Sequence, residues 1–251
     1  MRINGHAGPR FGSSFCLFLD VDGTLLEMAY PPSSVFVDPS LRDLLERVRH
    51  ELGGAMALVS GRTLAEVDRL FGSQGWPAAG LHGIERRNAS GQVELGIADQ
   101  QRVVEARPEL AAFAAQFPGV ILEDKGMSLA LHYRGAPEAE AEVRRTVEQV
   151  AERLGEGCVI QEGRMVMELR PRGATKGDAV RAFLAEEPFR GRRPIYIGDD
   201  HTDETAFAEV ERAGGISVAV GEHVQAMVHA ASPSDVRAFL EDLVELRTSI
   251  G

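Results

Sequence analysis

The amino-acid sequence predicts an α/β fold: a doubly wound core with a mostly parallel sheet, into which a smaller α+β domain is inserted. Short apolar runs alternate with segments of helical periodicity, which is typical of a sheet with helices packed on its faces. The runs at 15–19, 55–59, 194–197 and 216–220 are continuous rather than alternating, as expected for buried parallel strands. In the middle of the chain the runs alternate instead, which favours a separate unit there.

Helices are expected between and after these strands. Apolar residues in 41–52 follow helical spacing, with Asp38 as the expected N-cap and Pro39 at the first helical position. Thr63 and Glu66 have the spacing of a capping box for the next helix. Further helices are expected to begin near Thr175 and after Asp203 and Ser234.

The pattern changes from about Arg86 to Val166. The run MSLALHY, at 127–133, alternates apolar and polar side chains as a half-buried strand does, and two helices are expected at about 100–117 and 137–154. We therefore expect a core domain from residues 1–83 and 171–251 and an inserted α+β cap domain over 84–170. The crossings near Gly83 and Pro171 are the expected hinges.

Composition narrows the classes of partner and compartment. Lys+Arg 27 against Asp+Glu 38 gives a net charge of −11, which argues against nucleic acid and membrane surfaces as partners. Cys16 and Cys158 are far apart and form no disulfide framework, so a reducing compartment is expected. No apolar run has the length of a signal peptide core or a membrane span. We expect a cytoplasmic protein with a frayed N-terminus; its oligomeric state stays open, and a monomer is compatible with the sequence.

The stretch FLDVDGTL, at 18–25, places two carboxylates at the end of an apolar strand. Asp20 would stand at the carboxyl end of that strand, where open α/β sheets form their ligand crevice, and Asp22 can point into the same crevice before the turn at Gly23. Asp20 is therefore a candidate nucleophile and Asp22 a candidate proton-transfer group. The alternative is an ordinary acidic turn, since Asp and Gly are common turn residues.

A second strand, 194–197, also ends in carboxylates, at Asp199 and Asp200, with Asp203 and Glu204 close behind. Like charges this close repel one another and resist burial, and a hard divalent cation such as Mg²⁺ would neutralise them. The alternative is the acidic first turn of a helix, favoured by the helix dipole. That alternative carries more weight for Glu204 than for Asp199.

Two further segments offer groups that bind an oxyanion. LVSGR, at 58–62, ends a strand with Ser60 and Gly61, whose N–H can donate to a phosphate, although a simple cap and turn accounts for these residues equally well. GATKGD, at 173–178, places Lys176 in the first turn of a helix, where a cation opposes the helix dipole. This unfavourable placement indicates function; a solvated lysine is the alternative.

In chain order, DVDGT, LVSGR, Lys176 and GDDHTDE resemble the four motifs of the haloacid dehalogenase superfamily of phosphatases. The resemblance covers roughly 15–83 and 171–220. It implies that Asp20 attacks phosphorus and that Asp22 acts as general acid and then general base. It also implies a type C2 cap, which closes over the substrate, for the inserted domain.

The same resemblance implies a magnesium site and its supports. The implied Mg²⁺ ligands are Asp20, the main-chain carbonyl of Asp22, and Asp199. Asp200 and Asp203 are implied to support these ligands, and Ser60 and Lys176 to hold the phosphate.

A closer resemblance, to the trehalose-6-phosphate phosphatase family, rests on GLHGIERR, LEDKGMSLALHYR, MELRPRGATKGDA and GDDHTDETAF. It implies Mg²⁺-dependent hydrolysis of trehalose 6-phosphate to trehalose and phosphate through an aspartyl-phosphate intermediate. It further implies that Glu123, Lys125 and Glu168 bind glucose hydroxyls. From the residues alone, the favoured interpretation of each of these three is a solvent-facing residue of a half-buried sheet.

Two rival functions remain from the sequence. One is another sugar-phosphate phosphatase or phosphomutase with the same core, which would differ in the cap contacts. The other is a non-enzymatic phosphate sensor, which also uses an acidic cluster and a lysine; Asp22 argues against it, because a stable phospho-aspartate needs no neighbouring acid and base.

Overall fold

The computed structural model describes residues 14–28, 35–72, 75–96 and 100–248. The chain divides into two compact units, one formed by Met1–Leu95 with Thr175–Gly251 and the other by Gly96–Ala174. The frayed N-terminus expected for the first residues lies outside the described part of the chain.

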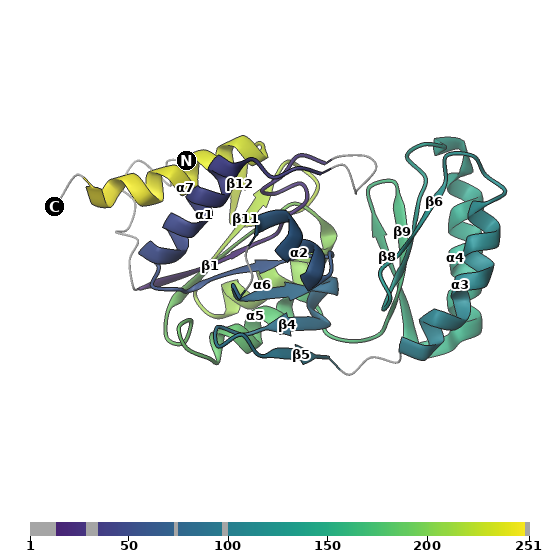
Figure 1. Cartoon of the computed structure of the whole chain (residues 1–251), viewed down its shortest axis with the longest axis horizontal. Coiled ribbons are helices and arrows are strands. Elements are labelled where there is room, and N and C mark those ends of the chain that lie inside the picture. Colours follow the sequence, from purple (N-terminus) through teal and green to yellow (C-terminus); the bar gives the residue numbers. More distant parts are fainter. Residues whose placement is uncertain (1–13, 29–34, 73–74, 97–99, 249–251) are drawn as a thin grey trace. The chain divides into compact units, whose positions relative to one another are not determined.

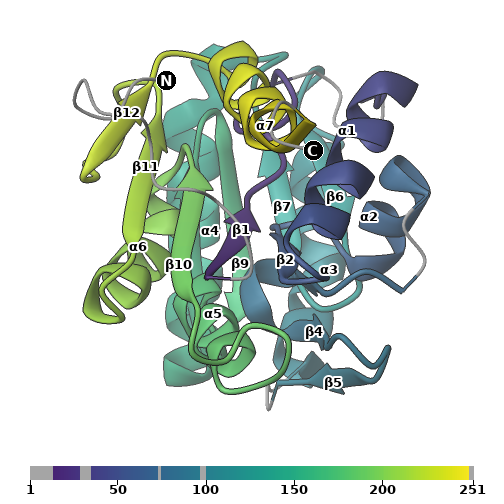
Figure 2. The same cartoon turned by 90° about the vertical axis from the view of Figure 1, so that its left-hand side faces the viewer.

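The larger unit is built on an eight-stranded sheet with the spatial order β12-β11-β10-β1-β2-β3-β4-β5. Figure 2 shows the strands from β12 to β2 side by side. Its strands are β1 (Phe15–Leu19), β2 (Met56–Val59), β3 (Ala78–Gly80), β4 (Glu85–Arg87), β5 (Val93–Leu95), β10 (Arg193–Gly198), β11 (Ile216–Val220) and β12 (Val228–Ala230). The strands from β12 to β3 pair in parallel, and β4 and β5 continue the sheet antiparallel. The predicted fold class and the four predicted parallel strands are confirmed.

The helices of this unit lie on both faces of the sheet. They are α1 (Pro39–Glu51), α2 (Leu64–Phe71), α5 (Lys176–Leu184), α6 (Glu204–Arg212) and α7 (Pro233–Thr248). In Figure 1, α1 and α7 lie together on one face, and α5 and α6 lie together on the other. The predicted caps are present: Asp38 accepts a hydrogen bond from the Ser40 N–H, and Thr63 and Glu66 form a capping box.

The order of the strands places the crevice of the sheet beside β1. From β1 the chain passes through α1 to β2 on one side, whereas from β10 it passes through α6 to β11 on the other. The strand order therefore reverses between β10 and β1, and ligands of open α/β sheets bind at the carboxyl ends of strands at such a point. Leu19 pairs with Ile197, so the residues that follow both strands emerge next to each other.

The smaller unit is an antiparallel sheet of four strands covered by two helices on one face (Figure 1). Its strands, in spatial order, are β6 (Ile121–Asp124), β7 (Leu129–His132), β9 (Val166–Pro171) and β8 (Cys158–Gly163). Its helices are α3 (Gln100–Ala114) and α4 (Glu140–Leu154). Leu129, Leu131 and Leu169 pack with helix residues such as Val147 in a core separate from that of the larger unit.

The strand expected to be half-buried, at 127–133, is more buried than its alternation predicts. Ser128 and Ala130 point away from the helices and yet are 1 % and 0 % exposed. Ala130 lies on an inner strand between Glu123 and Glu168, and Ser128, just before β7, donates a hydrogen bond to Glu168.

The units divide later in the chain than the boundaries predicted near Gly83 and Pro171. The first boundary lies after Leu95 because β4 and β5 pair with the edge of the large sheet, and the second lies after Ala174, beyond the end of β9 at Pro171. Strands of three residues carry too little periodicity to be recognised in a sequence.

Among the described residues, no helix is both long enough and apolar enough to span a bilayer.

Candidate active site

The tips of β1 and β10 meet at the predicted position. Asp20 directly follows β1, is 4 % exposed, and donates its main-chain N–H to the carbonyl of Ile197 in β10 at 2.9 Å. Gly23 has φ +84°, and a Cβ at this residue would lie 2.0 Å from Oδ2 of Asp199. Only glycine therefore allows the loop after β1 to approach the carboxylate that follows β10.

The hydroxyl of Thr24 links the two tips. Its Oγ1 lies 3.4 Å from Oδ2 of Asp20 and 3.3 Å from Oδ1 of Asp199, and the residue is fully buried. A single hydroxyl proton can be shared between these two acceptors or given to either of them. The hydroxyl thus partly compensates two carboxylates that repel each other.

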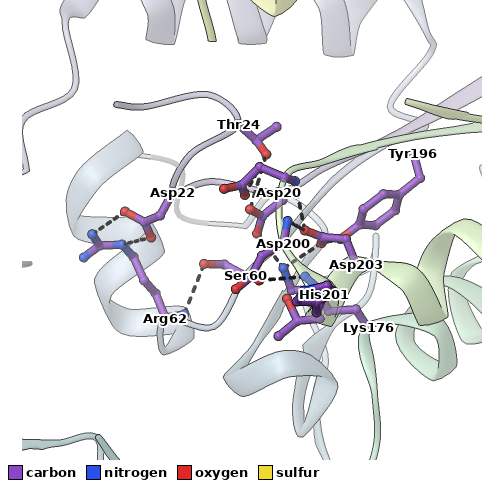
Figure 3. Close-up of polar contacts among 12 residues, drawn as sticks. Asp20, Asp22, Thr24, Ser60, Arg62, Lys176, Tyr196, Asp200, His201 and Asp203 are labelled. Atoms are coloured by element: carbon purple, nitrogen blue, oxygen red, sulfur yellow. Dashed lines mark hydrogen bonds and ion pairs between the residues drawn. The ribbon is translucent and has the colours of Figure 1, made fainter. Parts of the chain in front are cut away.

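Two carboxylates account for the unfavourable position of Lys176 at the start of α5. Its Nζ donates to Oδ1 of Asp20 at 2.8 Å and to Oδ1 of Asp203 at 2.7 Å, and the side chain is 3 % exposed (Figure 3). Burial favours the neutral amine, but the two carboxylates outweigh it and raise the pKa of Lys176 above its ordinary value. The lysine is a buried counter-ion rather than a solvated surface residue.

Asp203 holds the second tip in shape. Its Oδ1 accepts from Lys176 and from the Tyr196 hydroxyl at 2.6 Å, and its Oδ2 accepts from the N–H groups of Asp199 and Asp200 at 3.1 Å each. These four donors occupy the acceptor positions of this fully buried carboxylate. Its contacts fit the predicted supporting role.

The electrostatics of the cluster favour a cation. Carboxylate oxygens of Asp20, Asp199 and Asp203 all lie within 4.8 Å of one another. Burial raises the pKa of Asp20 well above its ordinary value, against the effect of Lys176 and together with the charges of Asp203 and Asp199. Burial and the charge of Asp203 likewise raise the pKa of Asp199 to about 7. One ammonium group faces three carboxylates, so a hard divalent cation fits this set of donors.

Ser60 and Gly61 are held by a turn that follows β3. The main-chain N–H groups of Leu81 and His82 donate to the carbonyls of Arg62 and Ser60, at 2.9 and 3.0 Å. Leu81 and His82 have φ +48° and +59°, a conformation that costs a non-glycine residue about 1–3 kcal/mol. A Cβ at Gly61 would lie 2.7 Å from Cε1 of the His82 ring, so the ring closes the space above Gly61.

Asp22 points away from Asp20 and towards Arg62 (Figure 3). Nε and Nη2 of Arg62 each donate to one oxygen of Asp22 at 2.6 Å, and the Arg62 side chain is 8 % exposed. The main-chain N–H of Arg62 also donates to Oγ of Ser60 at 3.1 Å. Arg62 thus connects the predicted acid and base to the predicted phosphate-binding loop.

The three residues expected to bind sugar lie together on one face of the smaller sheet. Glu123 and Glu168 are cross-strand neighbours of Ala130 on either side, and side chains in such register share a face. Lys125 Nζ lies 3.1 Å from Glu168 Oε2 and 4.0 Å from Glu123 Oε2. Ser128 donates to Glu168 Oε1 at 2.6 Å.

His132 completes this polar face through a 2.8 Å hydrogen bond with Glu123. Burial opposes ionisation of Glu123, but His132 and the charge of Lys125 hold the pKa of that carboxyl below its ordinary value. The face therefore presents the ionised carboxylate of Glu123 beside the ammonium group of Lys125.

The structure thus brings Asp20, Asp199, Asp203 and Lys176 into one cluster and Glu123, Lys125 and Glu168 into another. Sequence reasoning assigned no role to Thr24, Arg62 or Tyr196. Thr24 and Arg62 lie within the quoted segments DVDGT and LVSGR, which was the available signal. For Tyr196 no signal existed, because it reads as an apolar member of a buried strand.

Comparison with known proteins gives the family. A family model described as trehalose-phosphatase matches residues 18–242. A probable trehalose-phosphate phosphatase from Sinorhizobium fredii is 48 % identical over 215 residues, covering 85 % of this chain and 80 % of the relative. The trehalose-6-phosphate phosphatase of Escherichia coli K12 is 39 % identical over 234 residues, covering 93 % and 88 %.

A solved structure gives the same result. The crystal structure of a trehalose-6-phosphate phosphatase related protein superposes with a TM-score of 0.80 at 25 % identity, covering 95 % of this chain and all of the other. The resemblance to the trehalose-6-phosphate phosphatase family, predicted from segments such as GLHGIERR and GDDHTDETAF, is confirmed. This chain belongs to the trehalose-phosphatase family.

Proposed function

We propose that this protein hydrolyses trehalose 6-phosphate to trehalose and phosphate through an aspartyl-phosphate intermediate, with Mg²⁺ as cofactor. The observation that carries the proposal is the buried carboxylate of Asp20 at the tip of β1, bonded to Lys176 and close to Asp199. Support for the substrate comes from the names of relatives that are 48 % and 39 % identical to this chain.

In the proposed first step an oxygen of Asp20 attacks phosphorus. The bond between phosphorus and the sugar oxygen breaks, and the leaving oxygen takes a proton from Asp22. In the second step Asp22 takes a proton from water, the water oxygen attacks phosphorus, and the bond to Asp20 breaks to release phosphate. Lys176 favours the ionised form of Asp20 that the attack requires.

The proposal requires Asp22 to leave the position that it occupies in this structure. Both of its oxygens accept hydrogen bonds from Arg62, so neither is available to a leaving group. A rotation of the Asp22 side chain would release its oxygens from the Arg62 guanidinium, whose N–H groups could then donate to a phosphate oxygen.

Asp20, Asp199 and the main-chain carbonyl of Asp22 are the proposed ligands of Mg²⁺, and Asp203 and Asp200 their supports. When bound, the cation offsets the negative charge of the carboxylates and of the phosphoryl group that is transferred. Asp203 is a support because its oxygens already accept four hydrogen bonds.

The remaining substrate contacts are proposed for two segments. Ser60 and the N–H of Gly61 hold the phosphate together with Lys176. Glu123, Lys125 and Glu168 bind sugar hydroxyls, because a polyol both donates to carboxylates and accepts from an ammonium group.

The test is phosphate release from trehalose 6-phosphate with Mg²⁺ and with a chelator, alongside glucose 6-phosphate and sucrose 6-phosphate. We expect release only with Mg²⁺ and the highest kcat/KM for trehalose 6-phosphate. Equal rates on the three esters would favour a general sugar phosphatase. A long-lived phosphoprotein without turnover in a single-turnover trap would favour a phosphate sensor.

A further inference from the structure

Arg170 lies on the polar face of the smaller sheet, next to the residues proposed to bind sugar. It follows Glu168 by two positions in β9, so both side chains point to the same face, while Met167 and Leu169 point into the core. Its cross-strand neighbour on β8 is Val159, an apolar residue that offers it no acceptor.

Two nitrogens of the Arg170 guanidinium are buried without a hydrogen-bond partner in the part of the chain that the structure describes. The residue is 9 % exposed, and its Nε and Nη1 are buried and have no hydrogen-bond partner among the residues that the structure describes. The carboxylate of Glu168, its neighbour on this face, instead accepts from Ser128 and Lys125. Burial lowers the pKa of Arg170, and the charge of Glu168 opposes that effect.

The other buried arginines in the described part of the chain behave differently. Arg62 donates to Asp22 at 2.6 Å, Arg87 to Asp68 at 2.7 Å, and Arg86 to Glu186 at 2.8 Å. Each of them satisfies its charge with a carboxylate, as buried charges generally do. Burying N–H donors of a charged group without acceptors is costly to folding, so a role in binding is the physical reason to keep Arg170 there.

The surroundings of Arg170 indicate the class of ligand. Glu123 and Glu168 on the same face repel an anion, whereas Lys125 and Arg170 balance their charges, so a neutral ligand is favoured. The face alternates carboxylate acceptors with cationic donors, and only a ligand whose groups both donate and accept satisfies both. A polyol does this through its hydroxyls.

We propose that Arg170 is a substrate-binding residue whose unpaired N–H groups donate to hydroxyl oxygens of the sugar. This inference rests on the proposed function and adds to it a sugar contact that is cationic and prepared before the ligand arrives. It predicts that removing the charge of Arg170 weakens substrate binding and does not lower the stability of the fold.

Arg170→Met tests this prediction, because methionine fills similar space without charge or hydrogen-bond donors. The change removes the desolvation cost of a buried charge whose donors lack acceptors. We therefore expect the Tm to be unchanged or higher, while KM for trehalose 6-phosphate and the inhibition constant of trehalose rise by about tenfold to a hundredfold, the range for hydrogen bonds to a charged group. Hydrolysis of p-nitrophenyl phosphate, which has no sugar, should keep the wild-type kcat/KM.

Two further variants control the experiment. Arg144→Met removes an arginine of the same unit that pairs with Glu162 at 2.6 Å on the surface, and its KM should equal that of the wild type. Arg170→Lys keeps the charge with fewer donors, and its KM should lie between those of the wild type and of Arg170→Met. An intermediate KM for the lysine variant supports the inference even if the methionine variant folds poorly.

The inference would be overturned if both Arg170 variants kept the KM and the trehalose inhibition constant of the wild type. Failure of the proposed function is distinguishable, because it would appear in the wild type as no release from trehalose 6-phosphate. In that case the comparison of KM is made with the sugar phosphate that the wild type prefers, and an unchanged KM in the variants again overturns the role of Arg170.

Discussion

Asp22 and Arg62 are joined by two hydrogen bonds of 2.6 Å, although they are forty residues apart in the chain. Each donor of Arg62 meets one oxygen of the carboxylate, the geometry in which an arginine–carboxylate pair is strongest. Because Arg62 restrains the side chain of the candidate acid and base, we expect the activity of Asp22 to depend on Arg62.

This coupling predicts non-additive kinetics. Asp22→Asn should lower kcat by roughly 10²–10⁴-fold, the usual contribution of general acid and base catalysis. Arg62→Met should lower kcat/KM in the wild type but have a much smaller effect in the Asp22→Asn background, because the two residues act as a unit. The double-mutant cycle, measured by phosphate release, checks this; strictly additive effects would show that Arg62 acts independently of Asp22.

Asp20→Asn should abolish turnover and leave the fold intact. The amide oxygen can still accept from Lys176, and the change removes a carboxylate whose burial raises its pKa well above the ordinary value. The proposed nucleophile and a proposed metal ligand are lost together. Activity near that of the wild type, in a variant with unchanged circular dichroism and Tm, would exclude Asp20 as the nucleophile.

Asp199→Asn should separate metal binding from folding. Without a divalent cation the variant should be as stable as the wild type or more so at pH 8, because it removes one of three mutually repelling carboxylates. Mg²⁺ should raise the Tm of the wild type, since a ligand that binds only the native state stabilises it, and should have much less effect on the variant. An equal rise in Tm for both proteins would place the metal elsewhere.

Gly61→Ala should reduce both stability and activity, because its methyl group would lie within 2.8 Å of two atoms of the buried His82 ring. Overpacking of this kind costs about 1–3 kcal/mol. Adding His82→Gly should restore much of the loss, since it removes the ring and suits the positive φ of that residue. Thermal unfolding and KM of the two single variants and the double variant measure this; a double variant no better than Gly61→Ala would mean that another contact excludes the methyl group.

The sequence by itself determined the elements whose signals are local. The apolar run of β1, the N-cap Asp38 of α1 and the capping box at Thr63 depend on neighbouring residues and were all predicted from them. The meeting of Asp20 and Asp199 was also predictable, because parallel strands that flank a reversal of strand order end at the same edge of a sheet. Strands β3, β4, β5 and β12 were missed because three residues hold no clear period.

Only the tertiary structure decided which side chains became partners. Arg62 pairs with Asp22, whereas Nε and Nη1 of Arg170 are buried without a hydrogen-bond partner in the described part of the chain, and nothing in the residues beside either arginine distinguishes the two cases. The physical reason is that backbone preference and hydrophobic period act over a few residues, while the partner of a buried charge is set by strand register and packing between distant segments.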